Sequence, residues 1–384
     1  MRGLHLGPYG KPPDSTLHRL SSKSPGGVLL PRLEWLHCAV YETPITLTPF
    51  RLFLSPHLKR VILSASELSY VSRGQLAGLI QIFSVLPDSL EDLTITCGRG
   101  KEEPLEDAMS SFLCRSGSSL RRFCSNLPLS EAAIHHLLQL PYLRSWVIVQ
   151  GLPQTIPPSI FPPLEELHLR EQAALPWLHL LAAREGKPRI GLTPAAAIMN
   201  TNIKETLKHL RCPEDTPVDS TLLSCVSPFR SLVTLYVGGG YCEMVGICTF
   251  GLTDDDVENL TVTLPSLVSL RLGKACGLNS CRTTISSLLS ISTHCLGLSV
   301  LEIHFNTRTI AGDIRRLLNG GSGRDEPRCA LQSLLVGGLP LRVGEEAIGT
   351  VAMGFADIFP CLEGFSSVGD DWMSWKRVTS KLRD

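Results

Sequence analysis

The stretch LPSLVSLRLG at residues 264–273 contains a pattern that recurs through the whole chain. Two variable residues separate Leu267 from Leu270, one separates Leu270 from Leu272, and a proline stands just before them. Alternation of apolar and variable positions is typical of a half-buried strand, and proline stops a preceding helix. The stretch therefore predicts the end of a helix followed at once by a short strand.

Copies of this spacing follow one another at intervals that average about 30 residues, which indicates an internal repeat. Their first apolar positions are Met1, Leu33, Leu58, Leu90, Leu120, Leu143, Leu164, Leu207, Leu232, Leu267, Leu298, Leu331 and Leu362. The same repeat explains why 64 of the 384 residues are leucine.

Between the copies, the apolar residues take the spacing of a helix. Ser130 and Thr253 stand where helix N-caps are expected, and acidic residues follow Thr253 in the first turn. Helices are predicted over residues 76–86, 130–140, 282–295, 310–318 and 346–359, and from residue 253 onward. Each unit is therefore predicted to consist of one short strand, a turn and one helix.

One such unit cannot bury both its strand and its helix, whereas stacked units can. The sequence predicts an α/β fold, a leucine-rich-repeat solenoid over residues 1–384 with a curved, mostly parallel inner sheet and helices on the convex side. Residues 7–30 are predicted to form an irregular loop, 171–203 an insertion or degenerate repeat, and 319–328 a flexible linker. The main alternative is a doubly wound α/β enzyme fold. That fold needs strands made entirely of apolar residues and a glycine-rich phosphate turn, and the sequence shows neither feature.

Charge and composition narrow the class of partner. The 36 basic and 36 acidic residues balance, which argues against nucleic acid or an anionic membrane as the main partner. The sequence shows no apolar leader and no long apolar window. We expect the 13 cysteines to be reduced and the protein to be cytoplasmic or nuclear.

The sequence lacks the common motifs of metal sites and catalytic centres. The sequence contains no C-x-x-C, H-E-x-x-H or G-x-S-x-G, so we expect no metal, no cofactor and no catalytic residue. GEEAIGT at residues 344–350 has the glycine spacing of a phosphate loop, but threonine replaces the essential lysine, and a helix start is the better interpretation. Cys38 and Cys212 occupy the third apolar position, where we expect small buried hydrophobes. An enzyme with a diffuse site remains a minor alternative.

Two stretches carry a resemblance to a known family. TDDDVENL at residues 253–260, running into LPSLVSLRLGKACG at 264–277, resembles the cysteine-containing leucine-rich repeats of F-box proteins. LPRLEWLHC at residues 30–38 is similar to the degenerate repeats of fungal F-box/leucine-rich-repeat proteins. In that family the F-box docks on the Skp-type adaptor of a cullin ubiquitin ligase, and the repeats hold the substrate. The resemblance implies the substrate-recognition part of such a receptor.

The F-box itself is absent from the sequence, because residues 7–30 are rich in Gly, Pro and Ser where the family has three apolar helices. We therefore expect a Skp-type adaptor to bind only if an upstream F-box exists, and we expect residues 1–30 to fray. A leucine-rich-repeat scaffold or enzyme regulator unrelated to ubiquitin ligation remains open, since nothing within the repeats separates the two functions.

Positions +2, +4 and +6 from the first motif leucine are predicted to point out of the core, toward the concave face of the sheet. This face suits a protein partner better than a small molecule. The candidate partner-binding residues at these positions are Glu166, His168, Arg170, His209, Arg211, Tyr236, Arg271, Glu302 and His304.

Overall fold

The computed structural model describes most of the repeat pattern. The described residues are 2–6, 19, 28–39, 52–65, 79–97, 103–149, 162–170, 176–178, 201–213, 216–238, 250–273, 282–320, 328–336, 341, 344–367 and 372–383. The predicted loop at 7–30, the insertion at 171–203 and the linker at 319–328 lie largely outside these residues. Those three predictions therefore stay predictions.

Two compact units make up the chain, and each is described by itself. The first consists of Met1–Leu167 with Glu185–Asn202, and the second consists of His168–Arg184 with Ile203–Asp384. The sequence predicted a single solenoid over residues 1–384 and gave no indication of this division.

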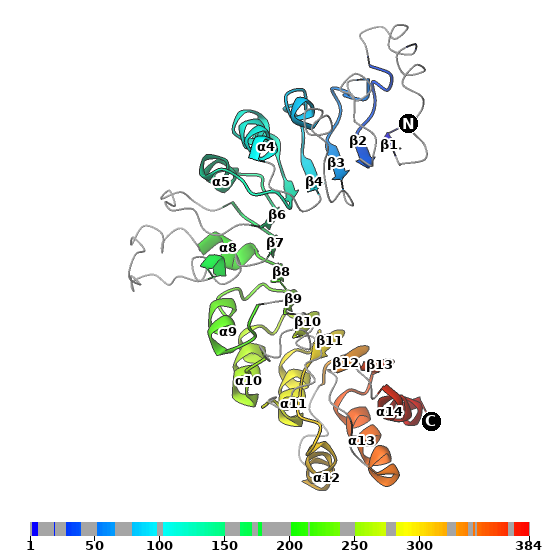
Figure 1. The fold of residues 1–384 in the computed structure, drawn as a ribbon. Coiled ribbons are helices and arrows are strands. Elements are labelled where there is room, and N and C mark those ends of the chain that lie inside the picture. Colours follow the sequence, from blue (N-terminus) through cyan, green and yellow to red (C-terminus); the bar gives the residue numbers. More distant parts are fainter. Residues whose placement is uncertain are drawn as a thin grey trace. The chain divides into compact units, whose positions relative to one another are not determined.

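Parallel strands in chain order form the sheet, as the repeat predicted. In both units, equivalent motif positions of neighbouring strands lie opposite each other, as Leu270 does with Leu235 and Leu301. The strands are β1 (Gly3–Leu6), β2 (Trp35–Ala39), β3 (Arg60–Ala65), β4 (Asp92–Cys97), β5 (Arg122–Ser125), β6 (Ser145–Ile148), β7 (Glu166–Leu169), β8 (His209–Arg211), β9 (Thr234–Val237), β10 (Ser269–Leu272), β11 (Val300–Ile303), β12 (Ser333–Val336) and β13 (Gly364–Ser367). A strand thus lies at each of the predicted motifs, and the prediction of an α/β leucine-rich-repeat solenoid is confirmed (Figure 1).

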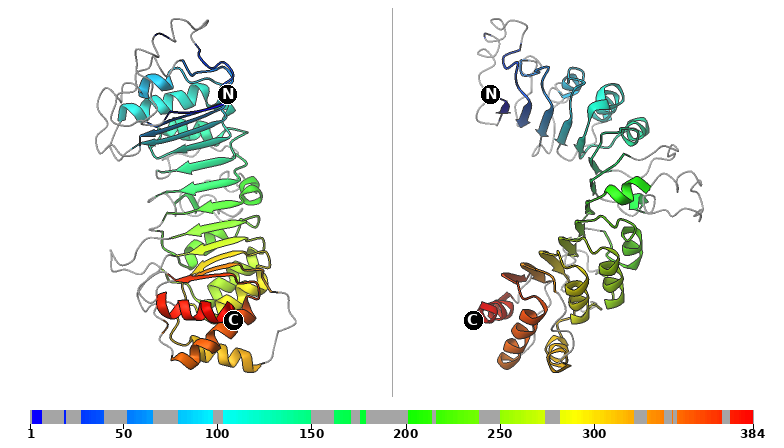
Figure 2. Two further views of the ribbon diagram at one scale, coloured as in Figure 1. Left: turned by 90° about the vertical axis from the view of Figure 1, so that its right-hand side faces the viewer. Right: turned by 180° about the vertical axis from the view of Figure 1, so that it is seen from behind.

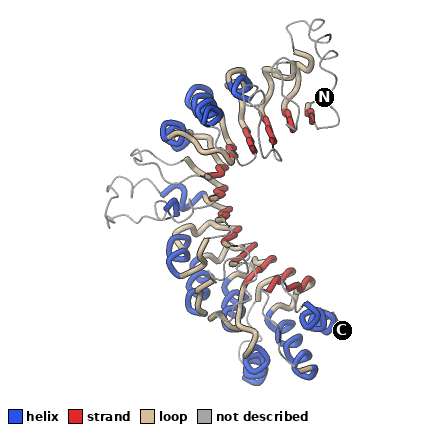
Figure 3. The backbone as a smooth tube through the Cα atoms, viewed as in Figure 1, coloured by secondary structure: helices blue, strands red, loops and turns tan. Residues whose placement is uncertain are grey.

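Within each unit the helices labelled in Figure 1 lie on one face of the strands, as two further views and the backbone tube also show (Figures 2 and 3). We call the opposite face of the sheet the inner face. The helices are α4 (Glu103–Ser116), α5 (Glu131–Leu138), α8 (Thr201–Thr206), α9 (Ser220–Val226), α10 (Asp254–Thr263), α11 (Ile285–His294), α12 (Ile310–Gly320), α13 (Glu345–Ile358) and α14 (Trp372–Arg383), with a short 3-10 helix η2 (Gly117–Ser119) after α4. Helices of consecutive repeats pack side by side, as α10 does against α11 and α13 against α14.

Motif leucines form the core between the strands and the helices. Leu267, Leu270 and Leu272 have no exposed surface, and neither do Leu93 and Leu36 of the first unit. Burying a leucine side chain stabilises a fold by about 1.5–3 kcal/mol, so a ladder of such residues is the main source of stability. The third apolar position accepts cysteine for the same reason, and Cys38 and Cys212 are buried as predicted.

The acidic residues at 254–256 lie in the first turn of α10 after the Thr253 cap, as the sequence predicted. Thr253 and Asp256 form a capping box at the start of α10. The Asp254 carboxylate reaches the next repeat, where it accepts hydrogen bonds from the Thr284 amide and hydroxyl, both at 2.7 Å, and from the Ser287 hydroxyl. One acidic side chain therefore links the start of α10 to the start of α11.

Two glycines end strands where the backbone turns sharply. Gly238 follows β9 with φ of 69°, and Gly273 follows β10 with φ of 72°. Positive φ is uncommon for residues with a Cβ atom. A Cβ at Gly273 would also lie 2.9 Å from the Phe250 ring. By contrast, Gly344 precedes α13 and Gly349 lies inside it, so the stretch at 344–350 opens a helix as predicted.

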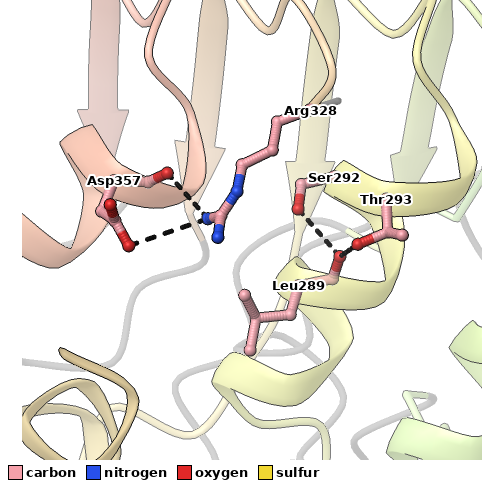
Figure 4. A network of polar contacts seen from close by, with 5 residues as sticks. All are labelled: Leu289, Ser292, Thr293, Arg328 and Asp357. Atoms are coloured by element: carbon pink, nitrogen blue, oxygen red, sulfur yellow. Dashed lines mark hydrogen bonds and ion pairs between the residues drawn. The ribbon is translucent and has the colours of Figure 1, made fainter. Parts of the chain in front are cut away.

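A polar cluster on the helical side ties the segment before β12 to α13 (Figure 4). The Arg328 guanidinium donates to the Asp357 carbonyl oxygen at 2.7 Å and lies 3.9 Å from the Asp357 carboxylate. The Cys329 amide donates to the Ser292 carbonyl oxygen at 2.8 Å. These contacts hold consecutive repeats together on the side away from the inner face.

Candidate functional site

The inner face presents the side chains at positions +2 and +4 of each motif. In β10, Leu270 and Leu272 are buried, whereas Ser269 and Arg271 remain half-buried. The same alternation occurs in β9, β11 and β12. The predicted strand register is therefore confirmed at these strands.

Four residues at position +4 lie next to one another in the second unit. Arg211 on β8 pairs in register with Tyr236 on β9, Tyr236 with Arg271 on β10, and Arg271 with Glu302 on β11. Neighbouring strands are about 4.8 Å apart, so the side chains stand side by side across four strands. We call these four residues the cationic row.

Tyr236 lies between two guanidinium groups in this row. The Cζ atom of Arg271 is 4.5 Å from the centre of the Tyr236 ring, and that of Arg211 is 6.0 Å from it. A cation over an aromatic face gains about 0.5–1 kcal/mol at an exposed site. The ring therefore holds both arginines close together on the inner face.

Glu302 supplies the negative charge of the row. Its carboxylate lies 3.7 Å from Arg271 Nε, which is ion-pair distance but beyond hydrogen-bond reach, and that buried Nε atom makes no hydrogen bond. Arg211 is exposed, and among the described residues no carboxylate lies within ion-pair distance of it. The row thus carries two cations and one anion.

At position +2 of the same strands, His209 is the one residue that can carry a charge. His209 is exposed, and Thr234 and Ser269 follow it in register on β9 and β10. The Ser269 hydroxyl is buried and has no hydrogen-bond partner. Beside the cationic row, position +2 is therefore polar on β8, β9 and β10 and apolar, as Val300, on β11.

The first unit pairs its inner-face charges. At position +2, Arg60 on β3 lies 2.8 Å from Asp92 on β4, and Arg122 on β5 lies 3.8 Å from Glu166 on β7. The Ser145 hydroxyl on β6 donates to the same Glu166 carboxylate at 2.7 Å. We call these residues the paired row, because each arginine has its own carboxylate.

A pair of histidines lies at the inner face of β1 and β2. The His5 and His37 rings meet edge to face with centroids 4.3 Å apart. Burial, together with the neighbouring His5, holds the pKa of His37 below its ordinary value of 6.5. Trp35, which is 39% exposed, stands beside them at position +2 of β2.

The structure places the predicted site residues unevenly. Arg211, Tyr236, Arg271 and Glu302 come together in the cationic row, and His209 flanks it. Glu166 belongs to the paired row of the first unit. His168 is half-buried and Arg170 is exposed at the end of β7. Their role in binding stays a prediction.

The placement of His304 on the open face is wrong. Its side chain is 2% exposed, and its ring centre lies 5.7 Å from that of Phe250. The physical reason is that β11 ends at Ile303, so the alternation of a strand no longer holds at position +6. Its carbonyl oxygen also accepts a hydrogen bond from the Thr283 hydroxyl.

The sequence reasoning missed the inner-face residues of the first unit. Arg60, Asp92 and Arg122 occupy position +2, and His5 and His37 occupy position +4. The counting rule that placed Arg211 applies equally to them. Applying it to every copy would have found both rows.

The buried thiols and the acidic and histidine side chains of the described residues bear on the chemistry of the site. Burial raises the pKa of the Cys212 thiol to about 12, so this thiol stays protonated and is a poor nucleophile. No group of three or more His, Cys, Asp or Glu side chains suited to a metal ion occurs among the described residues. No helix within them is long and apolar enough to cross a membrane.

Comparisons with known proteins add little. No protein-family model matches the chain, and no curated protein matches its sequence. One solved structure that it is similar to is the leucine-rich repeat-containing protein LegL7 from Legionella pneumophila, at 13% identity and a TM-score of 0.36 over 99% of this chain and 96% of that one. At these values the fold assignment rests on the strands and helices of this chain itself.

Proposed function

We propose that this chain is a protein-binding module that holds its partner on the inner face of the sheet. The cationic row is the observation that supports this most. It places two arginines and a tyrosine side by side, and these residue types are enriched at the energetic centres of protein interfaces. A row that crosses four strands favours a large partner over a small molecule.

Photo-crosslinking tests this proposal. A photoreactive amino acid at Thr234 or Ser333, both half-buried at position +2, is expected to form adducts with a partner protein. Val262 on α10 is 56% exposed on the helical side and serves as the matched control. Adducts of equal yield from Val262 would show that the inner face is not the binding surface.

A narrower proposal follows from the resemblance at residues 253–277. The module is the substrate-recognition part of an F-box-type ubiquitin-ligase receptor in the cytoplasm or nucleus. On this proposal an F-box outside the repeats contacts the adaptor, so the 384-residue chain is expected not to coprecipitate with a purified Skp-type adaptor. Stable adaptor binding by this chain contradicts that division of roles.

The fate of the crosslinked partner distinguishes this narrower proposal from the regulator alternative. Depleting the chain is expected to lengthen the lifetime of the partner and to lower its ubiquitination. If the partner is instead an enzyme whose activity changes on binding while its ubiquitination does not, the chain is a regulator.

We also propose that the repeats form one continuous solenoid over residues 1–384, apart from the loop, insertion and linker regions named above. Small-angle scattering tests this extent. A compact globule of this length has a radius of gyration of about 21 Å, and a continuous solenoid is expected to exceed it clearly. A value at the globular scaling contradicts the proposal.

Hydrogen exchange is expected to be faster over residues 1–30 than in β10 and β11.

A further inference from the structure

We propose that the cationic row binds an acidic, extended segment of the partner protein, with carboxylates pairing with Arg211 and Arg271 on either side of Tyr236. This inference rests on the proposed protein-binding function and adds the chemistry of the partner. It concerns the second unit alone.

The charges of the second unit carry the argument. At positions +2 and +4 of β8–β13, the charged side chains of the described residues other than histidine are Arg211, Arg271 and Glu302. The Glu302 side chain is 14% exposed and already faces Arg271, and among the described residues no carboxylate pairs with Arg211. An acidic segment supplies the missing negative charge.

The aromatic ring makes the two arginines a joint site. Both guanidinium groups lie within 6.0 Å of the Tyr236 ring centre, and the attraction to the ring restrains their orientations and offsets part of the repulsion between like charges. Arginine side chains fixed in this way lose less conformational freedom when a carboxylate binds. The Arg271 side chain is 43% exposed, so a carboxylate can reach it although its Nε atom is buried.

Strand spacing sets the spacing of the acidic residues. Arg211 and Arg271 lie two strands apart, which corresponds to about 10 Å at the backbone. In an extended peptide, residues at i and i+2 lie about 7 Å apart and residues at i and i+3 about 10 Å apart. Because alternate residues of an extended peptide point to the same face, acidic residues with one residue between them can reach both arginines at once.

The first unit provides a comparison, because the arginines at position +2 of its inner face are paired with carboxylates of the same chain. Arg60 and Arg122 each have a carboxylate within the chain, at 2.8 and 3.8 Å. An acidic segment has no unpaired arginine to bind in the paired row. The preference for acidic partners is therefore confined to the cationic row.

Fluorescence anisotropy with a short labelled peptide of alternating glutamate and serine tests the inference. Arg211→Gln and Arg271→Gln are each expected to weaken binding by about tenfold, since a hydrogen bond to a charged group is lost. A peptide with glutamine in place of glutamate is expected not to bind. The matched control is Arg316→Gln on α12, an arginine whose side chain is 87% exposed, and it is expected to leave the affinity unchanged.

Conservative variants separate charge from packing. Arg271→Lys keeps the charge and is expected to retain binding better than Arg271→Gln, while Tyr236→Phe keeps the ring and is expected to bind like the original chain. Equal affinity of the original chain and the double variant Arg211→Gln/Arg271→Gln overturns the inference. Binding of a phosphoserine peptide but not of the glutamate peptide also overturns it, because the proposed ligand is a carboxylate.

Selection from a random peptide library separates this inference from the proposed function. Enriched peptides that crosslink at Thr234 and are rich in Asp and Glu support both. Enriched peptides that crosslink there but carry no acidic bias overturn the acidic segment and leave the protein-binding function standing. Peptides that crosslink only at Val262 overturn both.

Discussion

The two units share a repeat and a core but differ in the charges on their inner faces. In the first, Arg60 and Arg122 are neutralised by Asp92 and Glu166 at position +2. In the second, the charged residues lie at position +4, where Arg211 and Arg271 both contact the Tyr236 ring and Glu302 pairs with Arg271. The same fold therefore carries one inner face on which the arginines have their own carboxylates and one on which Arg211 has none among the described residues.

The difference shows which positions of a repeat are constrained. Motif leucines are buried in both units, so they are fixed by packing. Positions +2 and +4 point away from that packing and are free to vary with function. The residues at positions +2 and +4 consequently indicate the function, because the repeated leucine spacing indicates only the architecture.

The largest expected effect is on stability and tests whether the cores are equivalent. Leu93→Ala in β4 and Leu270→Ala in β10 each remove a fully buried side chain at the same motif position. Each is expected to lower the free energy of unfolding by about 2–5 kcal/mol. Urea denaturation followed by circular dichroism measures both, with Ser269→Ala as the control near zero. A loss at one site only would show that the units do not share one kind of core.

The second prediction converts the paired row into a cationic one. In an Arg211→Gln/Arg271→Gln background, Asp92→Asn with Glu166→Gln leaves Arg60 and Arg122 unpaired. Binding of the glutamate peptide is expected to return to within about tenfold of the original affinity, because two free guanidinium groups are again available.

Glu165 provides the control for this conversion. Its carboxylate pairs with Arg144 at 4.0 Å outside the paired row, so Glu165→Gln is expected to restore nothing. If the double acid-removal variant also restores nothing while circular dichroism shows it folded, unpaired arginines alone do not make an acid-binding face.

The third prediction concerns the effect of Glu302 on the affinity of the cationic row for the glutamate peptide. Glu302→Gln removes the carboxylate that competes for Arg271 and is expected to strengthen glutamate-peptide binding by a few-fold, since a partly exposed ion pair contributes about 0.2–1 kcal/mol. Asp313→Asn on α12 removes a comparable ion pair on the helical side and serves as the control. Weaker binding by Glu302→Gln would mean that Glu302 positions Arg271 rather than competing for it.

The smallest expected effect concerns pH and the first unit. The pKa of His37 lies below 6.5 in the folded state, because of burial and of the neighbouring His5. The unfolded chain therefore takes up a proton more readily than the folded chain as the pH falls below 6.5. Stability from this residue is full above pH 6.5 and is lost as the pH falls toward the folded pKa.

Hydrogen exchange measured on both sides of that pH checks the expectation. Exchange in β1 and β2 is expected to accelerate at the lower pH relative to β10, and His37→Gln is expected to reduce the acceleration. The same acceleration in His37→Gln would assign it to other groups, such as His136 in α5, whose pKa is also lowered by burial.

Much of the fold could be predicted because it depends on local spacing. A strand lies at every copy of the motif, and α10 begins after Thr253 as its cap predicts. Residues 79–83 are helical within the predicted helix at 76–86. The helix α4 was not predicted, and neither was the division into two units, which depends on contacts between residues far apart in the sequence.

The candidate site was predictable by position but not by partner. Counting placed Arg211, Tyr236 and Arg271 on the inner face, since the register of parallel strands aligns equivalent positions. It could not place His304, because the strand ends one residue earlier and Phe250 packs against that ring. It also could not tell that Glu166 is paired with Arg122 while Arg211 has no carboxylate partner among the described residues, because those pairings depend on the neighbours of each strand.

The carboxylate of Asp254 has a consequence for how the second unit opens. Because it accepts three hydrogen bonds from Thr284 and Ser287 of the following repeat, α10 cannot unfold without depriving the start of α11 of its capping partner. In a chain of repeats, such a contact raises the free energy of a boundary between an unfolded repeat and a folded neighbour. The two repeats are therefore expected to unfold and refold together as one cooperative block. A chain cut between them would leave the Asp254 carboxylate without these three donors.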